Sequence, residues 1–120
     1  MVIDNDQIAL RIFKEVLELN GHDCTTYIDG EEGIRSYEKT SYDMVIMEND
    51  MPTHSGIEIL RNLKEQNPEA KVILCSSQSN DSLKTEAKAN GAFKYFDKPI
   101  NSWKLLQLLG AGKDNENWSN

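Results

Sequence analysis

The sequence contains little cysteine, little proline and few aromatic residues. Among its 120 residues there are 2 Cys and 3 Pro, and aromatic side chains make up 8%. Cys24 and Cys75 form no CxxC pair, and His22 and His54 have no ligand spacing to either cysteine. Neither a zinc site nor a disulfide framework is indicated, and a reduced, cytoplasmic compartment fits this cysteine usage.

Long apolar runs and an excess of positive charge are also missing. No run approaches the ~18 apolar residues needed to span a bilayer, and the opening MVIDND lacks the basic and apolar regions of a signal peptide. Lys and Arg number 13 against 20 Asp and Glu, which gives a net charge of −7. Such a chain repels phosphate backbones and anionic lipid, so neither nucleic-acid nor membrane binding is expected.

Short apolar runs alternate with amphipathic stretches, five of each, along most of the chain. This alternation is typical of repeated strand–helix units that form a mostly parallel sheet with helices on both faces. Strands are expected at residues 2–4, 24–28, 44–47, 72–75 and 93–96. Helices are expected between Asp6 and Asn20, at 31–38, from Gly56 to before Pro68, at 82–90 and at 103–109. The runs at 44–47 and 72–75 are apolar throughout, which predicts strands buried on both faces.

These elements predict one domain over residues 1–110, followed by a polar tail or linker over 111–120. A chain of 120 residues is long enough for one core, since domains cluster at ~100–150 residues. The last ten residues, AGKDNENWSN, have no hydrophobic periodicity.

Polar side chains follow four of the five expected strands. In a parallel sheet the carboxyl ends of the strands meet at one edge, where ligands usually bind. The residues concerned are Asp4, Asn5, Asp6, Glu48, Ser76, Ser77, Asp97 and Lys98. They suit a hard cation and a phosphoryl group, although acidic residues at strand ends also serve simply as caps and turn formers. Spacing alone does not decide between the two.

Four stretches in order carry a family resemblance: VIDND, DMVIMENDMPTHSG, VILCSS and GAFKYFDKPI. Together they resemble the receiver domain of bacterial two-component response regulators over about residues 1–110. The Met51-Pro52 pair with Gly56, combined with the series from Gly91 to Pro99, is the most specific part. The resemblance implies a flavodoxin-like, doubly wound (βα)5 fold with strand order 2-1-3-4-5.

In that family, an Asp at the end of the third strand accepts a phosphoryl group from a histidine kinase, and Mg²⁺ neutralises the charge. By resemblance, Ser76 and Lys98 are the phosphate-pocket residues, Tyr95 is the switch aromatic, and the Lys98-Pro99 peptide is cis. The metal ligands implied are the side chains of Asp4, Asn5 and Glu48 and the main-chain carbonyl of Asp50.

The chain departs from the family pattern at two of these positions. Glu48 stands where the acceptor Asp is expected, and Asn5 replaces one of two acids. A Glu carboxylate lies one methylene farther from the backbone, and misplacing a nucleophile by about 1 Å costs on the order of 100-fold in rate. Asn5 removes one negative charge, so Mg²⁺ binding is expected to be weak or absent.

These departures predict an atypical receiver that is not an enzyme and signals by protein–protein interaction, with little or no phosphorylation. Glu48 is expected to reach Lys98 and hold the domain in one signalling state, either on or off. The alternative is a functional phosphoacceptor that uses another acid of the pocket, such as Asp4 or Asp50, with Mg²⁺. A flavin or nucleotide site on the same fold is discounted, because the loop after the first strand contains no Gly.

The resemblance also implies where partners dock. In the family, a histidine kinase or an effector binds the face formed by the fourth helix, fifth strand and fifth helix. The sequence also allows the domain to dimerise, and it does not decide this point. Trp103 in the last helix is interpreted either as an exposed anchor on this face or as a core residue. On the last strand, Phe93 and Tyr95 are predicted to share one face, with Tyr95 partly exposed and Phe96 packed inside.

Overall fold

The computed structural model describes residues 1–78 and 80–110, which form five strands and five helices in strict alternation. The strands are β1 (Val2–Ile3), β2 (Thr26–Tyr27), β3 (Val45–Glu48), β4 (Val72–Ser76) and β5 (Lys94–Asp97). The helices are α1 (Gln7–Leu19), α2 (Gly30–Lys39), α3 (Gly56–Gln66), α4 (Asp81–Ala89) and α5 (Ser102–Gly110). The predicted tail over residues 111–120 lies outside the described residues.

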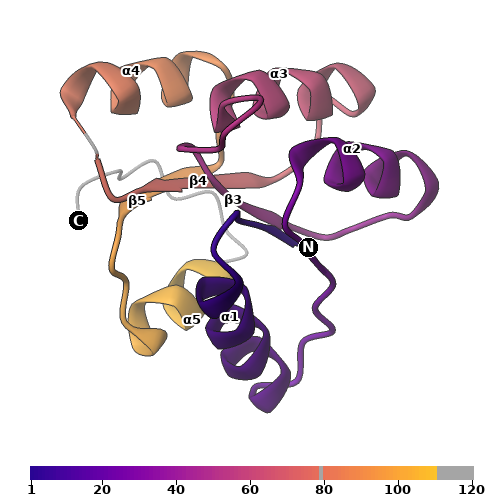
Figure 1. Ribbon diagram of the computed structural model, residues 1–120, viewed down its shortest axis with the longest axis vertical. Coiled ribbons are helices and arrows are strands. Elements are labelled where there is room, and N and C mark those ends of the chain that lie inside the picture. Colours follow the sequence, from indigo (N-terminus) through magenta and orange to yellow (C-terminus); the bar gives the residue numbers. More distant parts are fainter. Residues whose placement is uncertain (79, 111–120) are drawn as a thin grey trace.

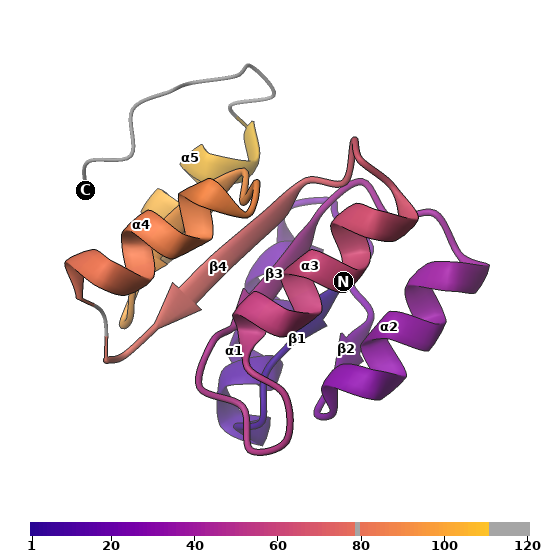
Figure 2. The same cartoon turned by 90° about the horizontal axis from the view of Figure 1, so that it is seen from above.

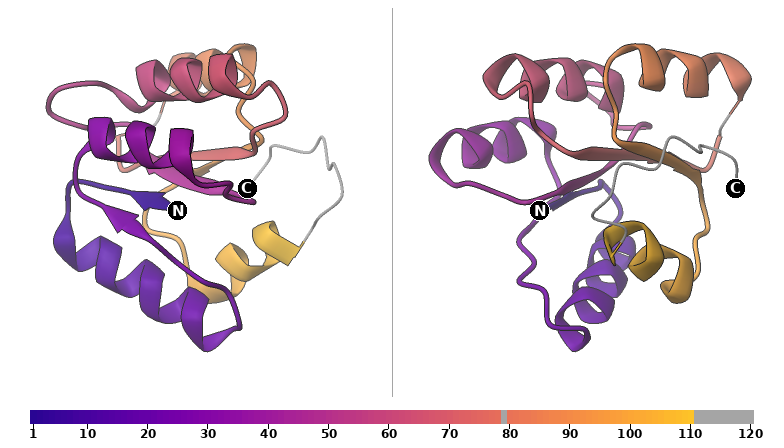
Figure 3. Two further views of the ribbon diagram at one scale, coloured as in Figure 1. Left: turned by 90° about the vertical axis from the view of Figure 1, so that its right-hand side faces the viewer. Right: turned by 180° about the vertical axis from the view of Figure 1, so that it is seen from behind.

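All five strands are parallel and lie in the order β2-β1-β3-β4-β5. Helices α2, α3 and α4 cover one face of the sheet and α1 and α5 the other, as Figure 1 and both views of Figure 3 show. The predicted flavodoxin-like, doubly wound fold is therefore confirmed. The central position predicted for the third strand is confirmed too, since β3 lies between β1 and β4.

The core is divided by the sheet into two apolar clusters. The larger cluster lies beneath α2, α3 and α4 and includes Ile3, Met47, Leu60 and Leu74. The other lies beneath α1 and α5 and includes Phe13 and Leu105, together with strand residues that point the other way. Every residue of β3 and β4 is buried, because helices cover both faces of these central strands.

Local sequence signals explain where several helices begin and end. Asp6 accepts a hydrogen bond from the backbone N–H of Ile8 and caps α1, as predicted. Ser55 and Glu58 form a reciprocal capping box at the start of α3. Gly91 follows α4 with φ of +88°, a left-handed conformation that favours glycine at this position.

The prediction for the aromatic residues near the last strand is right for Phe96, which packs inside, and wrong for Tyr95 and Phe93. Tyr95 is only 4% exposed and packs in the cluster beneath α2, α3 and α4, while Phe96 packs in the opposite cluster. Phe93 contacts the cluster of Phe96 and not that of Tyr95. It precedes β5, so the side-chain alternation of a strand does not apply to it. Tyr95 is buried because helices cover both faces of β5 even though this strand lies at the sheet edge.

Candidate functional site

An acidic cluster lies at the carboxyl ends of the strands, and a single lysine bridges it. Asp4 follows β1, Glu48 ends β3, and Lys98 follows β5. The ammonium of Lys98 lies 2.7 Å from Asp4 Oδ2 and 2.7 Å from Glu48 Oε1. The two carboxylate side chains are 2% and 4% exposed and that of Lys98 is 19% exposed. The three residues thus form a buried ion network, which we call the Lys98 bridge.

The remaining oxygen of each carboxylate in the Lys98 bridge accepts a backbone hydrogen bond. Asp4 Oδ1 accepts from the N–H of Asp6 at 2.9 Å, and Glu48 Oε2 accepts from the N–H of Asp50 at 2.8 Å. All four carboxylate oxygens therefore have a donor. A buried ion pair is stable only when its remaining hydrogen-bonding capacity is satisfied in this way.

Burial and pairing both affect the pKa values of Glu48 and Lys98, but a different effect is the larger one in each residue. Burial raises the pKa of Glu48, and hydrogen bonds from Lys98 and the Asp50 N–H only partly oppose this. Burial by itself lowers the pKa of Lys98, but its hydrogen bonds to Asp4 and Glu48 outweigh burial and raise that pKa well above its ordinary value. Lys98 is therefore fully charged throughout the physiological range of pH.

The loop between β3 and α3 is held against the strand ends by its own polar groups. Asn49 accepts hydrogen bonds from the N–H of Gly56 at 2.9 Å and, through its side chain, from the N–H of Ile57 at 3.2 Å. A Cβ on Gly56 would lie 2.7 Å from the Cα of Asn49 and 2.8 Å from the carbonyl oxygen of Glu48. Only glycine permits this close approach, which explains why the sequence has Gly at this position.

Ser76 lies beside the bridge at the end of β4 and is completely buried. Its hydroxyl donates to Asp50 Oδ2 at 2.7 Å and accepts from the N–H of Gln78 at 2.9 Å. The side chain of Asp50 therefore lies at the site, although as a metal ligand the resemblance implied only its main-chain carbonyl. The pairing of Glu48 with Cys75 across β3 and β4 brings Asp50 close to Ser76, and the sequence carries no direct signal of that register.

Not all of the predicted site residues are brought together. Asp4, Glu48, Asp50, Ser76 and Lys98 converge, and the Lys98-Pro99 peptide is cis. Asn5 follows Asp4 directly in the chain and is exposed, whereas Tyr95 lies in the core. The two histidines lie outside the cluster: His22 is exposed, and His54 lies 3.7 Å from Glu31 and 3.9 Å from Glu58.

The resemblance implies a Mg²⁺ site here, and in this structure a lysine lies between two of the implied ligands, Asp4 and Glu48. Mg²⁺ takes near-octahedral oxygen ligands, usually one or two carboxylates together with several waters. In the Lys98 bridge, the lysine ammonium takes the position of a cation between the two buried carboxylates. Within residues 1–78 and 80–110, no group of three or more His, Cys, Asp or Glu side chains is placed to hold a metal ion.

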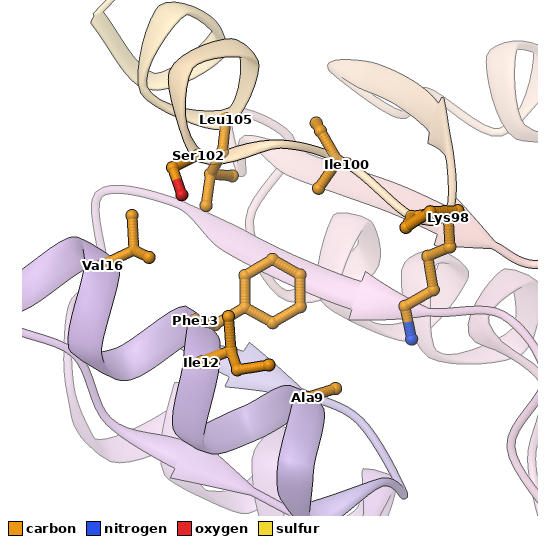
Figure 4. Close-up of a pocket in the computed structure, with 9 residues that line it drawn as sticks. Ala9, Ile12, Phe13, Val16, Lys98, Ile100, Ser102 and Leu105 are labelled. Carbon is orange, nitrogen blue, oxygen red and sulfur yellow. The ribbon is translucent and has the colours of Figure 1, made fainter.

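An apolar cavity of about 330 Å³ adjoins the bridge between α1 and α5. Its lining includes Ile12, Phe13, Ile100 and Leu105, and the aliphatic stem of Lys98 forms part of the wall. Figure 4 shows the lysine side chain extending from the β5–α5 connection past the apolar side chains of the lining, with its nitrogen at the far end. The same residue therefore contacts an apolar cavity through its stem and the acidic cluster through its head.

A doubly wound parallel sheet with acids, a hydroxyl and a lysine at its carboxyl edge defines the class of response regulator receivers. The chain belongs to this family: the response regulator receiver domain model matches residues 1–110. It is therefore a receiver domain of two-component signalling, a signalling module. In the part of the chain that the structure describes, no helix is long and apolar enough to cross a membrane.

Individual relatives agree with this assignment. The chain is 32% identical to protein CcdB of Bacillus subtilis over 110 residues, covering 91% of this chain and 92% of that protein. It is 26% identical to the chemotaxis protein CheY of the same organism, with the same coverage.

Solved structures also resemble the fold. A receiver domain protein from Clostridium thermocellum has a TM-score of 0.86 at 32% identity, covering 91% of this chain and 88% of that one. The CheX–CheY–BeF3–Mg²⁺ complex from Borrelia burgdorferi has a TM-score of 0.87 at 25% identity, covering 92% of this chain and 85% of that one.

Proposed function

We propose that this receiver domain signals without phosphorylation, through protein–protein contacts, with Glu48 at the phosphoacceptor position serving as a fixed charge. The observation that carries the proposal is the Lys98 bridge. Lys98, the residue that by resemblance holds phosphoryl oxygens, is already paired with Asp4 and Glu48 at 2.7 Å from each. The chain's own carboxylates thus already supply the negative partners of Lys98.

The geometry of Glu48 disfavours its use as a nucleophile. One carboxylate oxygen is bound by Lys98 and the other by the N–H of Asp50, and these donors stabilise the negative charge that an attacking oxygen would have to share. A phosphoryl group would also bring a charge of about −1.5 to −2 into a site where one ammonium already faces two buried carboxylates. With the cation position taken by Lys98, little remains to neutralise that charge.

The partner surface is proposed to be the face formed by α4, β5 and α5. Trp103 on α5 is 70% exposed, whereas Leu105 on the same helix is 2% exposed and packs in the core. The core interpretation of Trp103 is therefore wrong. An exposed Trp is the kind of side chain that acts as an anchor in protein interfaces, which supports docking of a histidine kinase or effector here.

The direct test is to incubate the protein with acetyl phosphate and Mg²⁺ and to weigh it intact. The wild-type chain is expected to gain no phosphoryl mass. The double variant Asn5→Asp, Glu48→Asp is the positive control, because it restores the missing charge and shortens the arm by one methylene.

The alternative is a working phosphoacceptor that uses an acid of this pocket with Mg²⁺. It predicts a phosphoryl mass on the wild-type chain, lost in Glu48→Gln if Glu48 is the acceptor. Retention of the mass in Glu48→Gln would point to Asp4 or Asp50 instead. Either result would overturn phosphorylation-independent signalling.

A further inference from the structure

Asp50 contacts both the Lys98 bridge and Ser76. Its backbone N–H donates to Glu48 Oε2 at 2.8 Å, and its carboxylate oxygen Oδ2 accepts from the hydroxyl of Ser76 at 2.7 Å. Asp50 itself is exposed, while Ser76 is completely buried. A carboxylate at the rim of the molecule thus reaches a hydroxyl at the end of a central strand.

We infer that Asp50 is a positioning residue whose carboxylate occupies, on Ser76, the place that a phosphoryl oxygen takes in a phosphorylated receiver. Glu48 does the same on Lys98, so both phosphate-pocket side chains are engaged by acids of the chain. This inference rests on the proposed function and deepens it, because it identifies Asp50 as the second acid, after Glu48, that takes the place of a phosphoryl group. Together Glu48 and Asp50 carry two negative charges, whereas Glu48 alone supplies one.

The contact to Ser76 is suited to set the conformation of the segment after β4. A hydroxyl that donates to a carboxylate makes a short, charge-assisted hydrogen bond, about twice as strong as a neutral one. The Ser76 oxygen in turn accepts from the N–H of Gln78 at 2.9 Å. The path Glu48–Asp50–Ser76–Gln78 therefore connects the Lys98 bridge to the residues directly after β4, the strand that precedes α4 in Figure 2.

Amide hydrogen exchange on the full chain tests this path. Asp50→Ala is expected to speed exchange at Ser77, Gln78 and the first turn of α4 by about tenfold, as the loss of about 1.4 kcal/mol of local protection would do. Ser76→Ala should have a similar effect, and adding Asp50→Ala to it should change exchange little further. Asp50→Asn is the matched control, since an amide oxygen keeps an acceptor but loses the charge, and it should have an intermediate effect.

Rescue by small anions separates an anion-like role from a merely structural one. Acetate or inorganic phosphate is expected to restore protection in Asp50→Ala, because either supplies an anionic oxygen to the Ser76 hydroxyl. Neither anion should restore protection in Ser76→Ala, which lacks the donor. Unchanged exchange in Asp50→Ala, additive effects in the double variant, or failure of both anions to rescue would each overturn the inference.

The failure of this inference is distinguishable from that of the proposed function. Unchanged exchange in Asp50→Ala, with no phosphoryl mass on the wild-type chain, removes the role of Asp50 and leaves phosphorylation-independent signalling intact. A phosphoryl mass on the wild-type chain overturns both, since a pocket that accepts a phosphoryl group has no permanent internal substitute.

Discussion

The pocket has two halves, the Lys98 bridge and the contact between Ser76 and Asp50, and they differ in how deeply their charged groups are buried. In the Lys98 bridge, Asp4 and Glu48 are almost completely buried and every carboxylate oxygen has a donor. In the other half, buried Ser76 is bound by an exposed carboxylate that water also reaches. Buried charges are costly to leave unpaired, whereas exposed ones are screened. The first half should therefore govern stability and the second should adjust local conformation.

Lys98→Met should produce the largest change. It removes the ammonium that lies 2.7 Å from Asp4 and 2.7 Å from Glu48, and it leaves two buried carboxylates facing each other. A loss of about 3–5 kcal/mol in the free energy of unfolding is expected, measured by urea denaturation. The triple variant with Asp4→Asn and Glu48→Gln is the control and should recover much of this loss. A loss below about 1 kcal/mol for Lys98→Met would contradict the importance of the bridge.

The second expected effect is a pH dependence of stability that comes from Glu48. Its folded pKa is raised by burial, so the folded state holds this proton more tightly than the unfolded state does. Its contribution is therefore most favourable at low pH, and stability falls as pH rises from the ordinary glutamate pKa of about 4.3 through the raised value. Denaturation curves across this window should show the fall in the wild type, and Glu48→Gln should lack it. A parallel pH profile in both proteins would contradict this attribution.

Adding Mg²⁺ tests whether another cation can bind between the carboxylates of the Lys98 bridge. Bound ligand raises thermal stability in proportion to its occupancy of the folded state. Millimolar Mg²⁺ is expected to leave the melting temperature of the wild type nearly unchanged, because Lys98 holds the cation position. The same Mg²⁺ should raise the melting temperature of Lys98→Met, with Ca²⁺ and Na⁺ at equal ionic strength as comparisons. A clear rise specific to Mg²⁺ in the wild type would contradict this expectation.

Asp50→Asn should have the smallest effect on global stability. The side chain is exposed, and surface substitutions usually change the free energy of unfolding by less than about 0.5 kcal/mol. Denaturation should therefore hardly distinguish this variant from the wild type, even where hydrogen exchange after β4 does. A loss of more than about 2 kcal/mol would contradict the assignment of stability to the Lys98 bridge alone.

Sequence patterns predicted the fold well where burial dictates the residue types. The apolar runs that form β3 and β4 are covered on both faces, so their composition indicates their place in the sheet. The burial of Tyr95 was not predictable from strand alternation, because alternation does not reveal which faces are covered by helices. The same limit applied to Trp103, whose exposure depends on how α5 lies against the sheet.

Within the site, the residues at the strand ends were predictable, but their contacts were predictable only in part. That Glu48 reaches Lys98 follows from the length of both side chains once parallel strands place them at one edge. The contact between Asp50 and Ser76 depends on the register of β3 against β4 and on the conformation of the following loop. Both are properties of the folded backbone, which residue types along the chain do not specify.

Gly56 shows how a residue without a side chain can control a charged pocket. Its backbone packs so closely on Asn49 and on the carbonyl of Glu48 that a single added methyl group has no room. A Gly56→Ala change would displace the loop that carries Asp50 and would alter both carboxylate contacts without changing any charge. A genetic screen for lost signalling would therefore identify Gly56 alongside the charged residues, although it has no chemical group to contribute.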